Sequence, residues 1–234
     1  MTRERPRDEL RPLTMRLGYT EMTAGSVLIE MGRTRVLCTA AVEADVPRWM
    51  RDSGKGWVTA EYGMLPGSSN DRIGRDQYQK GRALEISRLI GRALRSVVDL
   101  KAMGECMVRV DCDVLQADGG TRTAAITGAW VALNDAFEDA VARGVMARNP
   151  MIDHVAAISV GLVEGELLLD LEYEDDVKAE VDMNVVMSGR GLLVEVQGTA
   201  EGAPFSRGDL DAMLDLAGSG IEQLVEAQRQ AVAP

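Results

Sequence analysis

The change of hydrophobic period within residues 105–143 constrains the fold more than any other feature of the sequence. In residues 105–115, ECMVRVDCDVL, apolar residues alternate with charged ones, which predicts a strand with one polar face. From about Thr121 to Arg143 the apolar residues recur at helical spacing, which predicts a helix. Asp118-Gly119-Gly120 separates the two patterns. A strand, a tight glycine turn and a helix in direct succession predict a mixed α and β fold.

The same reasoning extends to the rest of the chain. We expect a strand hairpin over residues 25–42, a strand over 56–65, an amphipathic helix over 83–101, hairpins around 164–165 and 189–191, and a final helix capped by Ser206. The order of hairpins, helix, strand, helix, hairpins and helix suggests two strand-rich halves of a duplicated unit. We therefore predict an α+β fold in which residues 1–234 form a single compact domain.

Charge and histidine content narrow the possible functions. Residues 151–234 carry 4 Lys and Arg against 17 Asp and Glu, whereas residues 1–150 carry 22 against 20. This acidity argues against a nonspecific coat on nucleic acid, although it permits a local basic groove. His154 is the one histidine, which excludes a two-histidine nuclease mechanism and a zinc site with several histidines.

The apolar runs and the N-terminal residues bear on localisation. No apolar run approaches the ~20 residues needed to span a bilayer. The first residues, MTRERPRDELRP, are charged where a signal peptide would be apolar. We expect a soluble cytoplasmic protein.

The segment Gly119-Gly120-Thr121-Arg122 has the features of an anion-binding site. The first turn of a helix has free N–H groups and a partial positive charge, and Arg122 adds a planar donor suited to phosphate. Lys80-Gly81-Arg82 is a second basic element at the start of a predicted helix. An ordinary glycine turn with a surface arginine, and a solvated helix start, remain open alternatives.

The acidic segment DLEYEDDVKAEVDMN, residues 170–184, could hold a metal ion. Magnesium prefers oxygen ligands and is usually held by one or two carboxylates plus substrate phosphates, and Asp176 and Asp182 fit such a site. An acidic run is more often a solvated loop, so both interpretations stay open.

Residues 48–82 combine basic and aromatic side chains, and basic side chains can pair with phosphates while aromatic faces stack on bases. Acidic residues are interspersed among them. The alternative is a mixed-charge surface whose tryptophans belong to the core.

Taken together and in this order, these segments resemble ribonuclease PH over about residues 5–228. The segments that carry the resemblance are DELRPLT, GSVLIEMGRTRVLCTAAVE, VPRW, GWVTAEYGMLP, EISRLIGRALR, DCDVLQADGGTRTAAITGA, DLEYEDD, DMNVVM and VEVQGTAEGAPFS. The run DVLQADGGTRTA followed by DMNVVM is the most specific part.

The resemblance implies a ribonuclease PH-like duplicated βαβα fold, of the ribosomal protein S5 domain 2-like type. It implies a phosphate-dependent 3′→5′ exoribonuclease, also described as a tRNA nucleotidyltransferase. Such an enzyme trims the 3′ ends of tRNA precursors, acts on ribosomal RNA, releases nucleoside diphosphates, and adds nucleotides in reverse. The usual assembly in this family is a homohexameric ring, a trimer of dimers.

The resemblance also assigns roles to residues. Arg82 and the segment Gly120-Thr121-Arg122 would bind the attacking phosphate, and both arginines would act in catalysis. Asp176 and Asp182 match the catalytic aspartates that bind a divalent metal, Mg²⁺. Arg72 and Arg75 match arginines that hold tRNA.

The sequence departs from the family pattern between Arg75 and Arg82, where DQYQKGRA replaces a longer basic, glycine-rich run. We expect unchanged phosphate chemistry with weaker or altered tRNA affinity. Two alternatives remain: a catalytic exosome-type ring subunit, and an inactive RNA-binding ring subunit. The second is disfavoured because the matched arginines, threonine and aspartates are all present.

Overall fold

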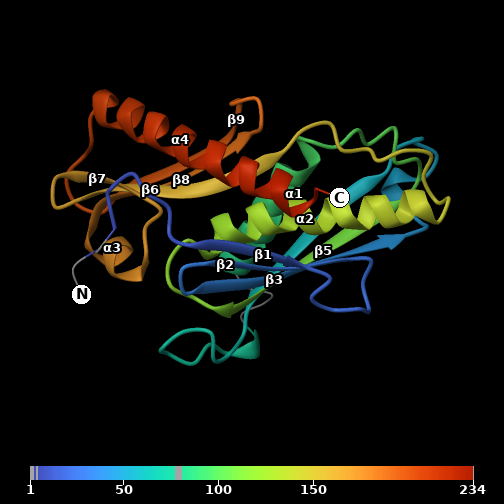
Figure 1. The fold of residues 1–234 in the computed structure, drawn as a ribbon, viewed down its shortest axis with the longest axis horizontal. Coiled ribbons are helices and arrows are strands. Elements are labelled where there is room, and N and C mark those ends of the chain that lie inside the picture. The colour runs from blue at the N-terminus through green and yellow to red at the C-terminus, as the bar shows by residue number, and fades with distance from the viewer. Residues whose placement is uncertain (1–2, 4, 77–80, 234) are drawn as a thin grey trace.

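Alternating apolar residues build a five-stranded sheet from the first half of the chain. The structure, a computed structural model, describes residues 3, 5–76 and 81–233 (Figure 1). The strands are β1 (Leu13–Leu17), β2 (Gly25–Met31), β3 (Thr34–Glu43), β4 (Trp57–Met64) and β5 (Met107–Gln116). They lie in the order β1-β2-β3-β5-β4, with only β4 and β5 parallel. The predicted hairpin and both predicted strands are confirmed.

The second half forms a four-stranded antiparallel sheet. Its strands are β6 (Val155–Val163), β7 (Glu166–Leu169), β8 (Ala179–Ser188) and β9 (Leu193–Ala200), in the order β7-β6-β8-β9. Both predicted hairpins are present. Strand β7 ends at Leu169. Asp170 takes a positive φ of 57°, which turns the backbone out of the sheet.

In the described part of the chain, four α-helices accompany the sheets: α1 (Gly81–Arg95), α2 (Thr121–Ala142), α3 (Tyr173–Lys178) and α4 (Arg207–Ala231), with a short 3₁₀ turn, η1, at Arg48–Met50. The predicted end of α1 at residue 101 is wrong. After the helix, the Ile152 N–H donates to the Val97 carbonyl at 2.9 Å, and the Asp99 N–H donates to the Pro150 carbonyl at 2.9 Å. This strand-like pairing with residues 150–152 ends the helix early.

The body of α2 lies between the two sheets. It packs on β2 and β3 on one side and on β6 on the other (Figure 1). Its side chains are buried over most of its circumference, including Ile126, Trp130, Leu133 and Phe137. A helix that is apolar all round belongs in a core. Burial of the whole helix fixes the position of its N-terminus, which follows the Gly119-Gly120 turn.

Helix α4 covers the second sheet. Ser206 accepts a hydrogen bond from the Asp209 N–H, and the Asp209 carboxylate accepts from the Ser206 N–H, which confirms the predicted capping box. Near the other end, the buried Gln228 amide donates to the Thr127 carbonyl of α2 at 3.0 Å and to the Val155 carbonyl of β6 at 2.9 Å. This amide joins α4, α2 and β6.

One fully buried ion pair connects the chain before β1 with the end of β7. The Arg11 side chain is 4% exposed and the Asp170 side chain 0%. Arg11 donates from Nε to Asp170 Oδ2 at 2.9 Å and from Nη2 to Asp170 Oδ1 at 2.7 Å. Its Nη1 donates to the Asp118 carbonyl at 2.5 Å. The pair thus joins three segments that are far apart in the sequence.

The α+β fold class is confirmed by these two sheets and their helices. The assignment of residues 1–234 to a single domain with two pseudo-repeated halves stays a prediction. Among the residues that the structure describes, no helix combines the length and apolar content that crossing a membrane would require.

Arg11→Met is expected to lower the free energy of unfolding by about 3–5 kcal/mol, because it leaves the buried Asp170 carboxylate without its partner. The control is Arg16→Met, since Arg16 pairs with Glu30 at 2.7 Å while its own side chain is 59% exposed. For Arg16→Met the free energy of unfolding should fall by no more than about 1 kcal/mol. Urea denaturation monitored by circular dichroism measures both, and equal losses would contradict the role given to Arg11.

Candidate active site

The glycine turn before α2 packs against the second half of the chain. Gly119 and Gly120 have φ values of 73° and 63°, in the left-handed region that favours glycine. A Cβ atom at Gly119 would lie 2.5 Å from the carbonyl oxygen of Leu171. The turn therefore sits directly beside the segment that leads into α3.

Two side chains hold this turn in place. Thr34 Oγ1 donates to the Gly119 carbonyl at 2.7 Å and accepts from the Asp118 N–H at 3.0 Å. Arg11 binds the Asp118 carbonyl, as described above. These contacts use the carbonyls of the turn. The N–H groups of the first turn of α2 have no acceptor within the helix, as at any helix N-terminus, and could therefore donate to a ligand.

Thr121 and Arg122 follow on the first turn of α2. Thr121 Oγ1 and Tyr62 Oη share a hydrogen bond of 2.8 Å, and Tyr62 comes from β4. Burial raises the pKa of Tyr62, while the positive charges of Arg82 and Arg122 oppose that rise. The phenol therefore stays neutral and lies within the electrostatic reach of both arginines.

The Arg122 side chain is largely enclosed, at 16% exposure. Its Nη1 donates to Gln197 Oε1 of β9 at 3.0 Å and lies 3.5 Å from Glu85 Oε1 of α1. Arg82 comes from the first turn of α1 and is exposed. The two arginines reach the site from different helices.

The two predicted aspartates share this neighbourhood. Loss of hydration raises the pKa of Asp176 in α3, with Arg82 and Arg122 opposing the rise. Loss of hydration and the neighbouring Asp176 charge raise the pKa of Asp182 in β8 to about 6, again opposed by Arg122 and Arg82. The carboxyl of Glu201 adds to both increases. The fold therefore brings together the predicted Arg82, Arg122, Asp176 and Asp182.

Short helix α3 is held by its own cap and by the N-terminal segment. Glu172 and Asp175 form a capping box, and Asp175 also accepts a hydrogen bond from Arg3 Nη1 at 2.9 Å. Arg3 donates in addition to the Leu169 carbonyl at 2.8 Å. A helix of this length is unstable alone, so these contacts fix the position of Asp176.

The acidic pair suits a magnesium ion better than a softer metal. Asp176 and Asp182 offer only carboxylate oxygens, in the number that a magnesium site completed by phosphate and water normally takes. Within the described parts of the chain, no group of three or more His, Cys, Asp or Glu side chains is arranged to hold a metal. The donor set thus fits an ion that is shared with a phosphate ligand.

The loop after β4 begins beside the site and carries the two other predicted residues. The Ala117 N–H, just before the glycine turn, donates to the Ser68 carbonyl at 2.7 Å. Arg72 and Arg75 are exposed farther along this loop, and no described contact joins them to the aspartates. Lys80, predicted as part of a second anion site, lies outside the described residues.

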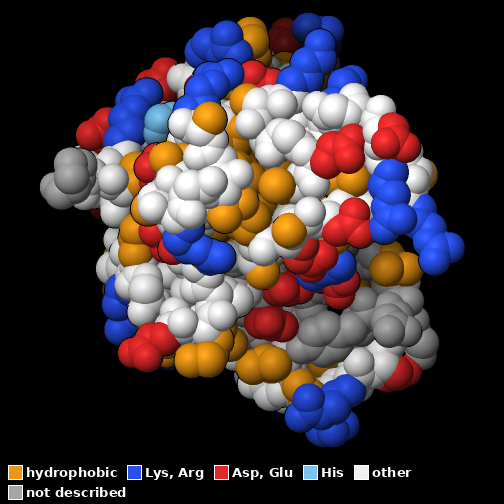
Figure 2. Space-filling model, turned by 90° about the vertical axis from the view of Figure 1, so that its right-hand side faces the viewer, with side chains coloured by type: hydrophobic (Ala, Val, Ile, Leu, Met, Phe, Trp, Pro, Cys, Tyr) orange, Lys and Arg blue, Asp and Glu red, His pale blue; other side chains and the backbone are white. Residues whose placement is uncertain are grey.

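Charged side chains of both signs share the protein surface, and two of the tryptophans differ in their exposure. Figure 2 shows one face on which Lys and Arg side chains alternate with Asp and Glu rather than forming one continuous basic area. Trp57 packs under the Arg95 guanidinium, but Trp49 is 66% exposed. The alternative that both tryptophans belong to the core is wrong for Trp49.

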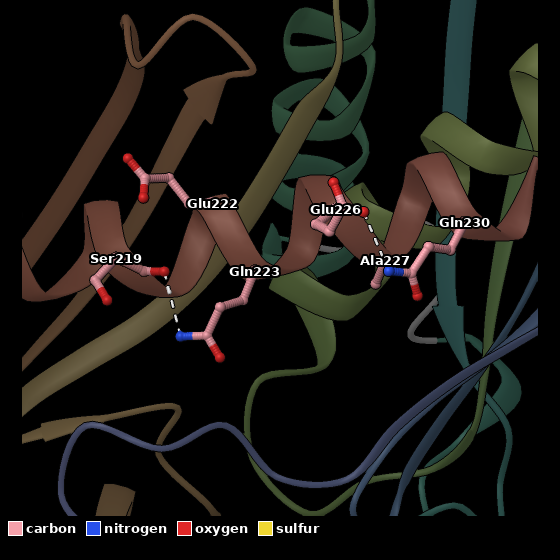
Figure 3. A pocket seen from close by; sticks show the side chains of 6 residues that line it. All are labelled: Ser219, Glu222, Gln223, Glu226, Ala227 and Gln230. Carbon is pink, nitrogen blue, oxygen red and sulfur yellow. Dashed lines mark hydrogen bonds between the residues drawn. The ribbon is translucent and has the colours of Figure 1, made fainter.

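An open pocket lies elsewhere, on the outer face of α4. Its volume is about 460 Å³, and it is lined by Ser219, Glu222, Gln223, Glu226, Ala227 and Gln230 (Figure 3). The hydrogen bonds drawn there join residues four apart on the same helix. It includes none of the predicted site residues.

Three site residues were not predicted from the sequence: Tyr62, Glu85 and Gln197. Tyr62 occupies an inward position of an alternating strand, where it resembles any core aromatic residue. Glu85 and Gln197 lie on a helix and a strand that are brought together only by the fold. No local sequence signal identifies them.

Comparison with protein families gives two matches. The model described as the 3′ exoribonuclease family, domain 1, matches residues 9–137, and the model for domain 2 of the same family matches residues 153–220. The chain therefore belongs to the 3′ exoribonuclease family.

Solved structures with the same fold include two exosome structures and one of rice Rrp46. An Archaeoglobus fulgidus exosome with RNA bound to the active site is 21% identical, with a TM-score of 0.81, over 95% of this chain and 90% of the other. Rice (Oryza sativa) Rrp46 is 18% identical, with a TM-score of 0.78, over 98% and 99%. An archaeal exosome core is 20% identical, with a TM-score of 0.77, over 96% and 89%. The predicted ribonuclease PH-like fold is confirmed.

The pKa of Asp182 makes a prediction about stability and pH. Because its folded-state pKa of about 6 exceeds the ordinary 3.8, the folded protein binds the proton more tightly, and stability falls as pH rises from about 4 to 6. In metal-free protein, Asp182→Asn should therefore raise the free energy of unfolding at pH 7.5 by about 1–2 kcal/mol. The same substitution should change little at pH 4. Urea denaturation at the two pH values measures this, and an equal effect at both would contradict the assignment.

Proposed function

We propose that this protein is a phosphate-dependent 3′→5′ exoribonuclease that trims the 3′ ends of tRNA precursors and acts on ribosomal RNA in the cytoplasm. Phosphate attacks the terminal phosphodiester, a nucleoside diphosphate leaves, and the reverse reaction adds nucleotides. The observation that carries the proposal is the convergence of Arg82, Arg122 and the N-terminus of α2 with Asp176 and Asp182. Positive donors can bind the attacking phosphate, and an acidic pair can hold the cation that joining two phosphate groups requires.

Inorganic phosphate would bind to Arg82, Gly120, Thr121 and Arg122. The N-terminus of α2 supplies backbone N–H groups, and the arginines neutralise the repulsion between the incoming phosphate and the RNA backbone. Tyr62 orients the Thr121 hydroxyl through their 2.8 Å hydrogen bond. Phosphate is already ionised at neutral pH, so the reaction requires no strong side-chain base. Positioning and electrostatics supply most of the rate enhancement.

Asp176 and Asp182 would hold the Mg²⁺ ion. Their raised pKa values reflect loss of hydration first and neighbouring negative charge second, and a bound cation would compensate for both. When bound, the ion neutralises charge on the attacked phosphoryl group and on the leaving 3′ oxygen. The role of the two carboxylates would be to hold that positive charge within reach of the arginines, so that the scissile phosphate could contact both.

Arg72 and Arg75 would contact the tRNA farther from the reacting bond. Both are exposed on a loop that begins at Ser68, next to the residue before the glycine turn. Acidic side chains are interspersed with the basic ones over residues 48–82, which favours weaker tRNA binding than a fully basic surface would give.

The assembly we propose is a homohexameric ring, a trimer of dimers. A second candidate is a catalytic subunit of an exosome-type ring with unlike partners, favoured by the similarity to exosome structures. An inactive RNA-binding ring subunit has less support because Thr121, both arginines and both aspartates are present. Native mass spectrometry of the purified protein separates the first two, since only the first assembles into six copies alone.

The reaction itself is tested with a 3′-extended tRNA and Mg²⁺, with and without inorganic phosphate. Nucleoside diphosphates should appear only when phosphate is present, because phosphate is the nucleophile. Thin-layer chromatography of the products distinguishes the outcomes. Nucleoside monophosphates released without phosphate would indicate hydrolysis and would overturn the mechanism.

Arg122→Ala should reduce phosphorolysis by about 10²–10³-fold, because it removes a preorganised donor to the reacting phosphate. Binding of tRNA, measured by gel shift, should stay within a few-fold of the original protein. If both fell together, Arg122 would belong to the RNA-binding surface rather than to the phosphate site.

A further inference from the structure

A chain of hydrogen bonds on one face of β9 ends at the guanidinium of Arg122. Arg92 of α1 donates from Nε to Glu195 Oε2 at 2.6 Å. Gln197 Nε2 donates to Glu195 Oε1 at 2.9 Å and lies 3.3 Å from Glu85 Oε1. Gln197 Oε1 then accepts from Arg122 Nη1 at 3.0 Å.

The neighbours of Gln197 determine which way its amide points. Its NH₂ group faces the carboxylates of Glu195 and Glu85, which can only accept when ionised. Its oxygen must therefore face Arg122, which can only donate. A reversed amide would place oxygen against two carboxylates and NH₂ against a guanidinium, so the network specifies one orientation.

A neutral acceptor at this position orients Arg122 without neutralising its charge. The guanidinium has five N–H donors in a rigid fork, and only Nη1 is committed to Gln197. A carboxylate at this position would form a shorter, stronger, charge-assisted bond and would compete with an anionic ligand. Glu85 is the carboxylate nearby, but it is half-exposed and remains 3.5 Å from Arg122.

We infer that Gln197 is a positioning residue for the phosphate site, which holds the Arg122 guanidinium in one orientation against β9 and keeps Glu85 from pairing fully with it. The inference rests on the proposed function and adds the residue that sets the affinity for phosphate. Through Glu195 and Arg92, the same chain links β9 to α1, the helix that also carries Arg82. One strand of the second sheet therefore contacts both helices that carry the arginines of the site.

The test replaces the amide by a carboxylate of the same size, Gln197→Glu. The KM for inorganic phosphate should rise by about tenfold or more, while kcat at saturating phosphate should stay within about twofold. The matched control is Gln223→Glu, the same chemical change on the exposed face of α4. It should alter neither constant, which removes net charge as the explanation.

A second variant, Gln197→Met, keeps the length of the side chain and removes its hydrogen bonds. It frees Arg122 to approach Glu85, so its KM for phosphate should lie between those of the original protein and Gln197→Glu. Equal KM values for Gln197→Glu and Gln223→Glu would overturn the inference. A fall in kcat with KM unchanged would overturn it as well.

Phosphate binding without RNA separates this inference from the proposed reaction. Titration calorimetry with inorganic phosphate alone should show the same order of affinities: original protein, then Gln197→Met, then Gln197→Glu. That order without nucleoside diphosphate release from RNA would support the role of Gln197 and contradict the proposed reaction. Absence of phosphate binding in the original protein would overturn both.

Discussion

The buried pair of Arg11 and Asp170 is the interaction on which the site depends. A charge with no access to water must be fully hydrogen-bonded, and the Asp170 carboxylate receives donors from both the side chain and the backbone N–H of Arg11. The remaining Nη1 of Arg11 reaches the Asp118 carbonyl. The segment before β1, the end of β7 and the turn before α2 are therefore fixed relative to each other. The helix N-terminus and the acidic residues face each other because of this junction.

The site places two aspartates and two arginines close together, and contacts with neighbouring residues hold them in position. Burial raises the energetic cost of ionising both Asp176 and Asp182, and the charge of Asp176 raises it further for Asp182. Arg82 and Arg122 offset only part of this cost. The supporting contacts lie one or two residues away from the reactive groups: Arg3 holds Asp175 rather than Asp176, and Thr34 holds Gly119 rather than Thr121. The reactive side chains are thus placed precisely enough for binding while their polar atoms stay available.

Much of this arrangement could be predicted from local sequence signals. The alternating valines of β5, the helical spacing of α2 and the capping pair Ser206 and Asp209 each act over a few residues, so the sequence shows them directly. Local patterns pointed to the glycine turn with Arg122 and to the pair Asp176 and Asp182, but they left an ordinary turn and a solvated acidic loop as alternatives. The resemblance to a known family decided between these interpretations. The end of α1 was misplaced because it is set by pairing with residues 150–152, a contact distant in sequence. Gln197 and Tyr62 escaped prediction for the same reason.

The close approach of Gly119 to Leu171 also restricts how this chain can diverge. A methyl group at Gly119 would meet a backbone carbonyl rather than a movable side chain, so a compensating substitution at one neighbouring position cannot make room. Accommodation would require a shift of the whole segment that leads into α3, which also carries Asp176. A substitution in the first half of the chain therefore depends, at this point, on where the backbone of the second half lies. The turn can change only if two distant stretches of sequence change together.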